Sequence, residues 1–221
     1  MSKMKIKFCG NKSLEDYKAS LQTGADYLGF VFAESKRQVK AEKVAKWVAD
    51  LPPQNKLLVG IFVNQSKEEI LQAVRTVPLD VIQCHGDEDL NFLKELKAAC
   101  DVEIWKVIHH EDETSVEKLE SFLGLIDGFV IDKKNGTQYG GTGTSFNWAH
   151  IPLYDKLSTQ YNIPYLIAGG INVETLPELL PYDPEGIDLS SGMEVDRVKS
   201  KEKMNLIESM VREHDKRTNA R

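Results

Sequence analysis

Short apolar runs rich in β-branched residues alternate with longer amphipathic stretches along the whole chain. Runs of this kind are typical of strands in a parallel sheet, which is covered on both faces. The predicted strands comprise residues 4–9, 27–32, 57–63, 81–84, 103–108, 128–132, 164–168 and 186–190. The predicted helices comprise residues 13–23, 41–51, 67–77, 90–100, 115–123, 148–159, 173–180 and 199–216. Two helix starts carry N-capping patterns, Ser13 with Asp16 and Ser66 with Glu69.

Eight strand–helix repeats predict an α/β fold, a single-domain (β/α)₈ TIM barrel over residues 1–221. The chain length gives about 28 residues per repeat, a compact version of this barrel. An open doubly wound sheet is the competing architecture, and its dinucleotide-binding form carries G-x-G-x-x-G after the first strand. The first strand instead runs into Cys9-Gly10-Asn11-Lys12, and no linker divides the chain, which favours the barrel. Residues 212–221 are mixed in charge and are expected to form a frayed tail.

Charge and composition narrow the classes of partner. The chain has 28 Lys and Arg against 34 Asp and Glu, and the net charge of −6 has the wrong sign for a general nucleic-acid or anionic-membrane binder. No apolar run has the length of a membrane helix, and no apolar segment follows the basic N-terminus as in a signal peptide. Cys9, Cys84 and Cys100 are sparse and have no paired spacing. We therefore expect reduced thiols in a cytoplasmic protein, with Cys84 and Cys100 in the core.

Strand ends provide the candidate chemistry, because active sites of this barrel lie at the carboxyl ends of the strands. Cys9 ends the first strand, and we expect Gly10 to leave its thiol accessible as a base or nucleophile. Asp132 ends the sixth strand after an apolar run, where burial should favour the neutral acid that a proton donor needs. The alternatives are a small buried hydrophobic residue at position 9 and a carboxylate at 132 that only solvates the strand end.

Small residues follow the sixth, seventh and eighth strands, and many such barrels hold a phosphate after the seventh and eighth. Backbone N–H groups exposed by such loops bind a dianion without a large cation. The sequence therefore predicts a small phosphorylated ligand, with these phosphate-binding residues: Gly141, Gly143, Gly169, Gly170, Ser190, Ser191 and Gly192. His109-His110-Glu111-Asp112 looks like a metal cluster, but neighbouring strand residues point to opposite faces, so we predict no metal there.

These strand-end motifs resemble the phosphoribosylanthranilate isomerase family of tryptophan biosynthesis over nearly the whole chain. The matching motifs in the first half are Lys7-Phe8-Cys9-Gly10, Gly24-Ala25-Asp26-Tyr27-Leu28-Gly29-Phe30-Val31-Phe32, Ser35-Lys36-Arg37, Gly60-Ile61-Phe62-Val63-Asn64 and Ile82-Gln83-Cys84-His85-Gly86-Asp87-Glu88. Those in the second half are Gly140-Gly141-Thr142-Gly143, Ala168-Gly169-Gly170-Ile171-Asn172 and Asp188-Leu189-Ser190-Ser191-Gly192-Met193-Glu194. The number and order of the motifs make the resemblance specific.

The resemblance implies an Amadori rearrangement of N-(5-phosphoribosyl)anthranilate to 1-(2-carboxyphenylamino)-1-deoxyribulose 5-phosphate. It implies Cys9 as the general base and Asp132 as the general acid. It further implies that Arg37 holds the anthranilate carboxylate, while His85 and Asp188 line the substrate site. No cofactor or metal is implied, because the iminium nitrogen of the substrate is the electron sink. The expected partner is this small phosphorylated substrate, bound by a monomer or a homodimer.

Three positions depart from the family pattern. Thr144 and Asn147 stand where the family often has Lys and Asp, and Phe8 stands where an aliphatic residue is usual. The competing enzyme is the histidine-pathway phosphoribosyl isomerase, whose family has Asp at the position of Cys9 and two repeated halves that are not evident here. A phosphate-binding barrel without catalytic activity is the competing interpretation outside enzymes.

Overall fold

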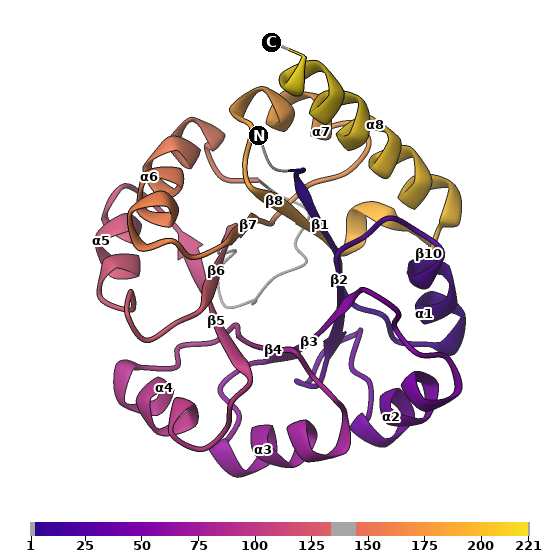
Figure 1. The fold of residues 1–221 in the computed structure, drawn as a ribbon, viewed down its shortest axis with the longest axis vertical. Coiled ribbons are helices and arrows are strands. Elements are labelled where there is room, and N and C mark those ends of the chain that lie inside the picture. Colours follow the sequence, from indigo (N-terminus) through magenta and orange to yellow (C-terminus); the bar gives the residue numbers. More distant parts are fainter. Residues whose placement is uncertain (1–2, 134–144, 221) are drawn as a thin grey trace.

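The computed structural model describes residues 3–133 and 145–220, and its centre is a closed barrel of eight parallel strands (Figure 1). The strands are β1 Lys5–Phe8, β2 Tyr27–Val31, β3 Leu57–Phe62, β4 Val81–Cys84, β5 Glu103–His110, β6 Gly128–Lys133, β7 Tyr165–Ile167 and β8 Gly186–Leu189. Strand β1 pairs in parallel with both β2 and β8, which closes the barrel. The predicted (β/α)₈ barrel is therefore confirmed, and an open sheet is excluded.

Helices follow the strands and form the outer ring of the molecule (Figure 1). They are α1 Leu14–Leu21, α2 Ala41–Asp50, α3 Lys67–Thr76, α4 Leu90–Lys97, α5 Thr114–Glu120, α6 Ile151–Tyr161, α7 Leu176–Leu179 and α8 Lys201–Asn219. In the described residues, three 3₁₀ turns accompany them: η1 Trp148–His150 before α6, η2 Leu180–Tyr182 after α7, and η3 Ser191–Met193 after β8. A short antiparallel hairpin, β9 Glu194–Val195 and β10 Val198–Lys199, connects η3 to α8.

The two predicted N-capping patterns differ in outcome. Ser66 and Glu69 form a complete capping box, in which each side chain bonds the other's backbone N–H. Ser13 accepts a hydrogen bond from the backbone N–H of Asp16, as predicted. The Asp16 carboxylate does not return to Ser13; it accepts hydrogen bonds from the backbone N–H groups of Lys12 and Lys199. This aspartate therefore anchors the β9–β10 hairpin to the start of α1.

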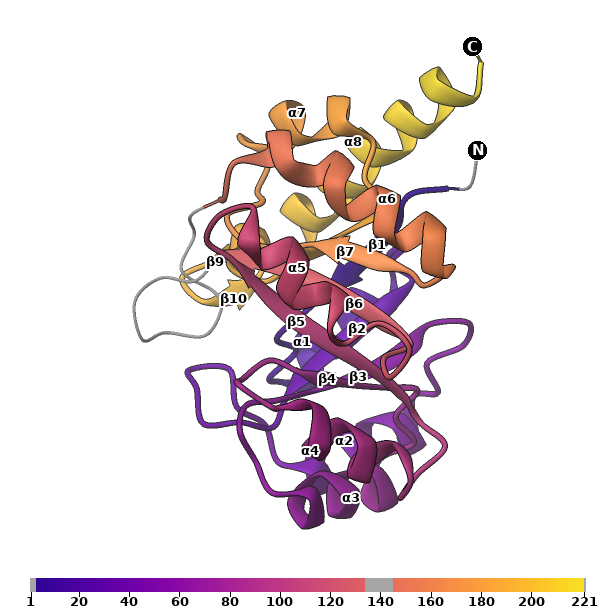
Figure 2. The same ribbon diagram turned by 90° about the vertical axis from the view of Figure 1, so that its left-hand side faces the viewer.

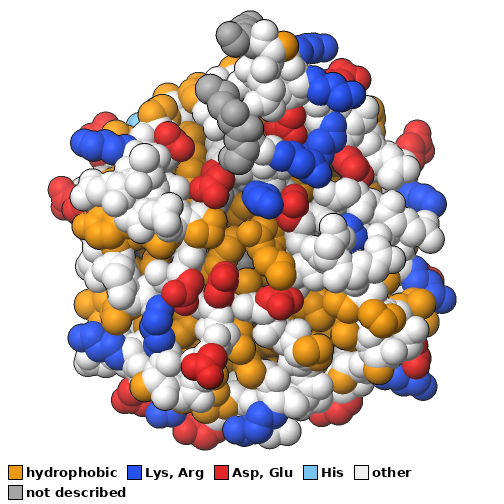
Figure 3. Space-filling view, in the orientation of Figure 1, with side chains coloured by type: hydrophobic (Ala, Val, Ile, Leu, Met, Phe, Trp, Pro, Cys, Tyr) orange, Lys and Arg blue, Asp and Glu red, His pale blue; other side chains and the backbone are white. Residues whose placement is uncertain are grey.

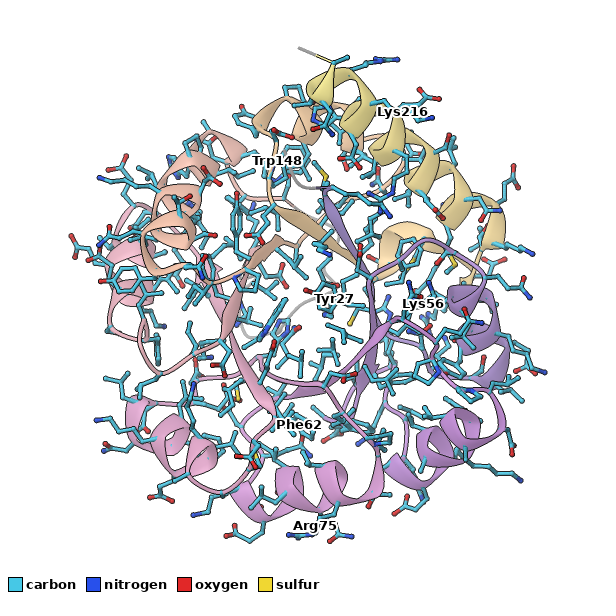
Figure 4. The ribbon with its side chains drawn as sticks, viewed as in Figure 1. Tyr27, Lys56, Phe62, Arg75, Trp148 and Lys216 are labelled. Carbon is cyan, nitrogen blue, oxygen red and sulfur yellow. The ribbon has the colours of Figure 1, made fainter. Side chains whose placement is uncertain are left out.

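Side chains alternate between two cores because successive strand residues point to opposite faces. One core lies between strands and helices and includes Ile6, Phe8 and Phe62. The other fills the barrel with residues such as Tyr27 and Trp105, whose rings meet edge to face at 5.2 Å. Figure 4 shows Tyr27 inside the barrel and Phe62 toward the surrounding helices. The interior is therefore packed below the mouth rather than open as a pore.

The two ends of the barrel carry different elements. In Figure 2 the β9–β10 hairpin lies beyond the carboxyl ends of the strands, and the N-terminus lies at the opposite end. Figure 3 views that opposite end, where hydrophobic side chains gather at the centre among acidic and basic ones. The segment 212–221, expected to fray, is instead helical as far as Asn219, since Arg212 bonds the Met4 carbonyl and Asp215. None of the helices in the described parts of the chain has the length and apolar content needed to cross a membrane.

Candidate active site

A cavity of about 440 Å³ opens at the carboxyl ends of the strands. It brings together nine of the residues predicted from sequence: Cys9, Arg37, His85, Asp132, Gly169, Gly170, Asp188, Ser190 and Ser191. Two of them lie in β6 and β8, and the others follow β1, β2, β4, β7 and β8. Apolar walls, among them Val31, Ile61 and Ala168, complete the lining. Such a mixture of apolar walls and few polar groups suits a small-molecule ligand.

Cys9 lies directly after β1 and is 8% exposed, so its thiol is more buried than the sequence alone suggests. Gly10 serves another purpose, because a Cβ at that position would lie 2.5 Å from Cδ of Arg37. Gly10 also has a φ of +76°, a conformation that favours glycine. Room for the thiol comes from Gly29, where a Cβ would lie 2.8 Å from the Cys9 sulfur. Burial raises the pKa of Cys9, while the cations Lys7, Lys199 and Arg37 oppose that increase.

Asp132 is 3% exposed at the end of β6, and its carboxylate has few partners. Oδ1 accepts a hydrogen bond from the adjacent backbone N–H of Lys133 at 2.8 Å. Oδ2 lies 3.5 Å from Nε2 of His85, which projects from the end of β4. The other ring nitrogen of His85 is 3.3 Å from the side-chain amide of Gln83. The carboxylate and the imidazole therefore lie next to each other in the lining of the cavity.

Arg37 belongs to a partly buried ionic cluster. Its Nε and Nη2 each donate to one carboxylate oxygen of Glu194 at 2.8 Å. Lys199 Nζ donates to the same carboxylate at 3.0 Å and to the carbonyls of Cys9 and Ser190. Burial alone would raise the pKa of Glu194, but hydrogen bonds from Arg37 and Lys199 lower it to about 2. The edge formed by Nη1 and the second N–H of Nη2 donates no hydrogen bond to any described residue, so it can receive a second carboxylate.

A second ionic group lies inside the barrel beneath the cavity. Lys7 is fully buried and donates to Oδ2 of Asp188 at 2.7 Å and to Oε1 of Gln83 at 2.8 Å. Burial would lower the pKa of Lys7, but the Asp188 carboxylate overcomes this and raises it, so Lys7 is protonated. Oδ1 of Asp188 has no hydrogen-bond partner among the described residues, and Asp188 lines the cavity. Asp188 therefore keeps one buried acceptor that no described residue uses.

The loops after β7 and β8 expose backbone to the cavity. Gly169 and Gly170 have φ values of +83° and +68°, which turn the chain tightly away from the strand. Within the described chain, the amides of Gly169, Gly170 and Ser190 donate no hydrogen bond to protein atoms. Gly192 does not line the cavity; a Cβ there would lie 1.9 Å from the carbonyl oxygen of Ile171, so it lets the two loops pack together. Gly141, Gly143 and Thr144 lie outside the described residues.

The remaining sequence candidates lie as follows. His109 faces the ring of His85, whereas His110 bonds Tyr154 and His150 on the other side of β5. The burial of His109 lowers its pKa to about 4, which makes it neutral at physiological pH. Asn147, one of the departures from the family pattern, caps η1 through its side chain. Cys84 is fully buried, but Cys100 is only partly buried, unlike the core position expected for it.

The sequence alone assigns no role to Lys7, Gln83, Glu194 or Lys199. Lys7 and Glu194 lie within motifs that resemble the family, and strand alternation from Cys9 already places Lys7 inside the barrel. A lysine that faces a barrel interior needs a hydrogen-bonding or charged partner, so the position of Lys7 in the sequence already indicates a buried polar group. Lys199 gives no such signal, because only the fold returns the hairpin to the end of β1.

Comparisons with known proteins identify relatives that are similar in sequence and in fold. The family model for N-(5′-phosphoribosyl)anthranilate isomerase matches residues 6–210. The enzyme of that name from Halalkalibacterium halodurans is 44% identical over 206 residues, or 93% of this chain and 94% of the relative. The crystal structure of the Thermotoga maritima enzyme has a TM-score of 0.81 at 26% identity and covers 95% of this chain and 99% of its own. A phosphoribosyl anthranilate isomerase crystallised with reduced 1-(o-carboxyphenylamino)-1-deoxyribulose 5-phosphate has a TM-score of 0.79 at 25% identity, with the same coverage.

Proposed function

The chain belongs to the N-(5′-phosphoribosyl)anthranilate isomerase family, and from that premise we propose how its residues carry out the rearrangement in tryptophan biosynthesis. The proposal rests on one observation: a thiol, a carboxyl group and a guanidinium from three separate strand ends line a single cavity. Those are a base, an acid and a carboxylate receptor, which are the groups that an Amadori rearrangement of an anthranilate needs.

Asp132 starts the reaction by giving a proton to the ribose ring oxygen. The bond between C1′ and that oxygen breaks, and the anilino nitrogen lone pair forms the C1′=N bond of an iminium ion. His85, 3.5 Å from the carboxylate, holds the acid toward the substrate. The electron sink is the substrate nitrogen, so the step requires no cofactor.

Cys9 then takes the proton from C2′, and the C–H electrons form C1′=C2′ while nitrogen recovers its lone pair. The enolamine gains a proton at C1′ and loses its enol proton to give the ketone. Burial raises the pKa of Cys9 in the ligand-free protein. The iminium cation beside the thiol favours the thiolate at the step that needs it, because an opposite charge stabilises the charged form.

The two ends of the substrate match two parts of the cavity. The free edge of Arg37 receives the anthranilate carboxylate through two parallel N–H···O bonds, since Glu194 already occupies the other edge. The loops with Gly169, Gly170 and Ser190 receive the phosphate through their exposed amides. Ser191 lines the same part of the cavity, and Gly192 lets the loops pack. Asp188, which also lines the cavity, faces the ribose hydroxyl groups.

The direct test is turnover of freshly prepared phosphoribosylanthranilate, followed by anthranilate fluorescence. We expect fluorescence loss that depends on Cys9 and Asp132. No turnover, together with retained binding of the reduced product analogue, would instead support the non-catalytic phosphate-binding barrel. We also propose that the enzyme is cytoplasmic, which its three free cysteines support. It is a monomer or a homodimer, and light scattering of the purified protein distinguishes the two states.

A further inference from the structure

Lys7 and Cys9 share one side of the same strand. They are two residues apart at the end of β1, so both side chains enter the barrel, while Phe8 between them packs against the outer core. Lys7 is fully buried, and a buried ammonium is costly unless nearby groups compensate for its lost hydration. The position of this charge, one layer below the thiol, therefore needs an explanation.

The hydrogen bonds of Lys7 use only part of the donor capacity of its ammonium group. An ammonium group has three donors, and Asp188 and Gln83 accept from two of them. No oxygen in the described chain accepts from the third. Cys9 is close enough to interact electrostatically with the ammonium, and this interaction is one of those that raise the pKa of Lys7. The same geometry leaves Oδ1 of Asp188 without a partner among the described residues.

Charged groups reach Cys9 from four elements. They are Lys7 on β1, Asp188 on β8, Lys199 on β10 and Arg37 after β2. Arg37 and Lys199 both bond Glu194, so much of their charge is already balanced. Among the three cations, Lys7 lowers the pKa of the Cys9 thiol most, against the increase caused by burial and by Asp188.

We propose that Lys7 is a positioning residue for the isomerase reaction: its ammonium stabilises the thiolate of Cys9 and holds Asp188 at the base of the cavity. This inference rests on the proposed role of Cys9 as the base. Lys7 does not contact the substrate, because it lies sealed beneath Cys9 and Asp188. Its positive charge stabilises the thiolate of Cys9, whereas burial of the site disfavours that charged form.

The test measures the Cys9 thiolate directly. Wild type and Lys7→Met are alkylated with iodoacetamide across a pH series, and mass spectrometry of the peptides separates Cys9, Cys84 and Cys100. We expect Cys9 in Lys7→Met to react about tenfold or more slowly at pH 8, with its midpoint moved to higher pH, because alkylation follows the thiolate fraction. Cys100, which is partly exposed, is the internal reference and should react at the wild-type rate in both proteins.

Two further variants control for general damage to the barrel. Lys106→Met removes another buried lysine, whose carboxylate partner is Glu88, and should leave the Cys9 profile as in wild type. Lys7→Met in an Asp188→Asn background avoids an unpaired carboxylate, so it keeps the test open if Lys7→Met alone does not fold. In that background also, removing the lysine should slow Cys9 alkylation. A folded Lys7→Met protein, in either background, with an unchanged Cys9 profile would overturn the proposal.

Turnover supplies a second measurement. The acid limb of kcat/KM should move to higher pH in Lys7→Met, because the free enzyme must lose the thiol proton before it can act as base. We expect kcat to fall more than KM rises. If wild type itself has no turnover, the proposed function fails, while the alkylation series still decides whether Lys7 stabilises the thiolate.

Discussion

The barrel contains two buried lysine–carboxylate pairs that differ in how completely their hydrogen-bonding groups are used. Lys106 on β5 donates to Glu88 and to the carbonyls of Cys84 and Gly86. Glu88 in turn accepts from the backbone amides of Asn64 and Gly86. All three ammonium donors and both carboxylate oxygens have partners. This pair fastens the loop after β4 to the neighbouring strands.

The pair of Lys7 and Asp188 is incomplete by comparison. One donor of Lys7 finds no oxygen, and one oxygen of Asp188 finds no donor, within the described chain. Each lysine also has a cysteine nearby. Cys9, near Lys7, lines the cavity, whereas Cys84, near Lys106, is fully buried. A saturated pair stabilises the fold, whereas an unsaturated pair at a cavity retains capacity for a ligand or a reacting group.

The largest effect should come from the cysteine on the unsaturated side. Cys9→Ala should lower kcat by about 10²–10⁴, the usual contribution of a general base, with little change in the melting temperature. Cys9→Ser should also be poor, since a hydroxyl is far less acidic than a thiol. Cys84→Ala is the matched control; it should lower stability and leave kcat near the wild-type value. Fluorescence turnover and thermal unfolding of the three variants decide this, and a Cys9→Ala enzyme of normal kcat would remove the base from the mechanism.

Asp132→Asn should lose turnover on the ring-closed substrate by a similar factor, on the order of 10²–10⁴, because the ring oxygen then has no proton donor. An open-chain analogue that needs only C2′ deprotonation bypasses this step. The variant should therefore process the analogue far better, relative to wild type, than it processes the ring-closed substrate. Equal losses on both substrates would show that Asp132 is not the ring-opening acid.

The saturated pair should have the larger effect on folding. Lys106→Met leaves the Glu88 carboxylate buried without its cation and should lower the free energy of unfolding by about 3–5 kcal/mol. Lys7→Met should cost less, because Lys7 and Asp188 have fewer hydrogen bonds to lose than Lys106 and Glu88. Chemical denaturation of both variants measures the difference. A greater loss of stability in Lys7→Met would contradict the division between a structural and a functional pair.

The fold and the mouth of the site follow from the sequence for a physical reason. Strand periodicity fixes which residues end a strand, and in a closed parallel barrel all such ends meet, so the order of the chain alone places Cys9, His85 and Asp132 together. Strand periodicity does not predict how individual side chains pack around the site. The sequence predicts that Gly10 exposes the thiol, but this glycine makes room for Arg37 instead.

Long-range ionic partners cannot be predicted from the sequence in this way. Glu194 and Arg37 are 157 residues apart, and Lys199 reaches Cys9 across 190 residues. No local pattern encodes such pairs, because they depend on where the β9–β10 hairpin folds back. The frayed tail predicted at the end of helix 201–219 is wrong for the same reason, since contacts of Arg212 with the start of β1 cannot be inferred from its neighbours in sequence.

Arg37→Lys should mainly affect binding. Lysine keeps the charge but cannot hold Glu194 on one edge and a substrate carboxylate on the other. We expect KM to rise about tenfold, the value of roughly one lost charge-assisted hydrogen bond, with a smaller decrease in kcat. Steady-state kinetics separates the two. An unchanged KM with a collapsed kcat would assign Arg37 to the transition state.

Glu194→Gln should have the smallest effect on substrate binding. It tests a group intermediate between the saturated and the unsaturated pair, because Arg37 donates to Glu194 from one edge and its other edge is unused by the described residues. Glutamine keeps one acceptor and loses the charge, so KM should rise only a few-fold.

The difference in stability between wild type and this variant should depend on pH in a defined way. Hydrogen bonds from Arg37 and Lys199 outweigh burial and lower the pKa of Glu194 from 4.5 to about 2 in the folded protein. The unfolded chain therefore binds a proton at Glu194 more readily than the folded chain does, and stability from this group rises with pH. It should be fully present above about pH 4.5 and lost as the pH falls toward 2. Wild type should be more stable than Glu194→Gln near neutrality, and the difference in unfolding free energy should shrink across that window. A constant difference from pH 6 to pH 2 would mean that Glu194 contributes through shape rather than charge, and that Arg37 keeps its orientation without the ion pair.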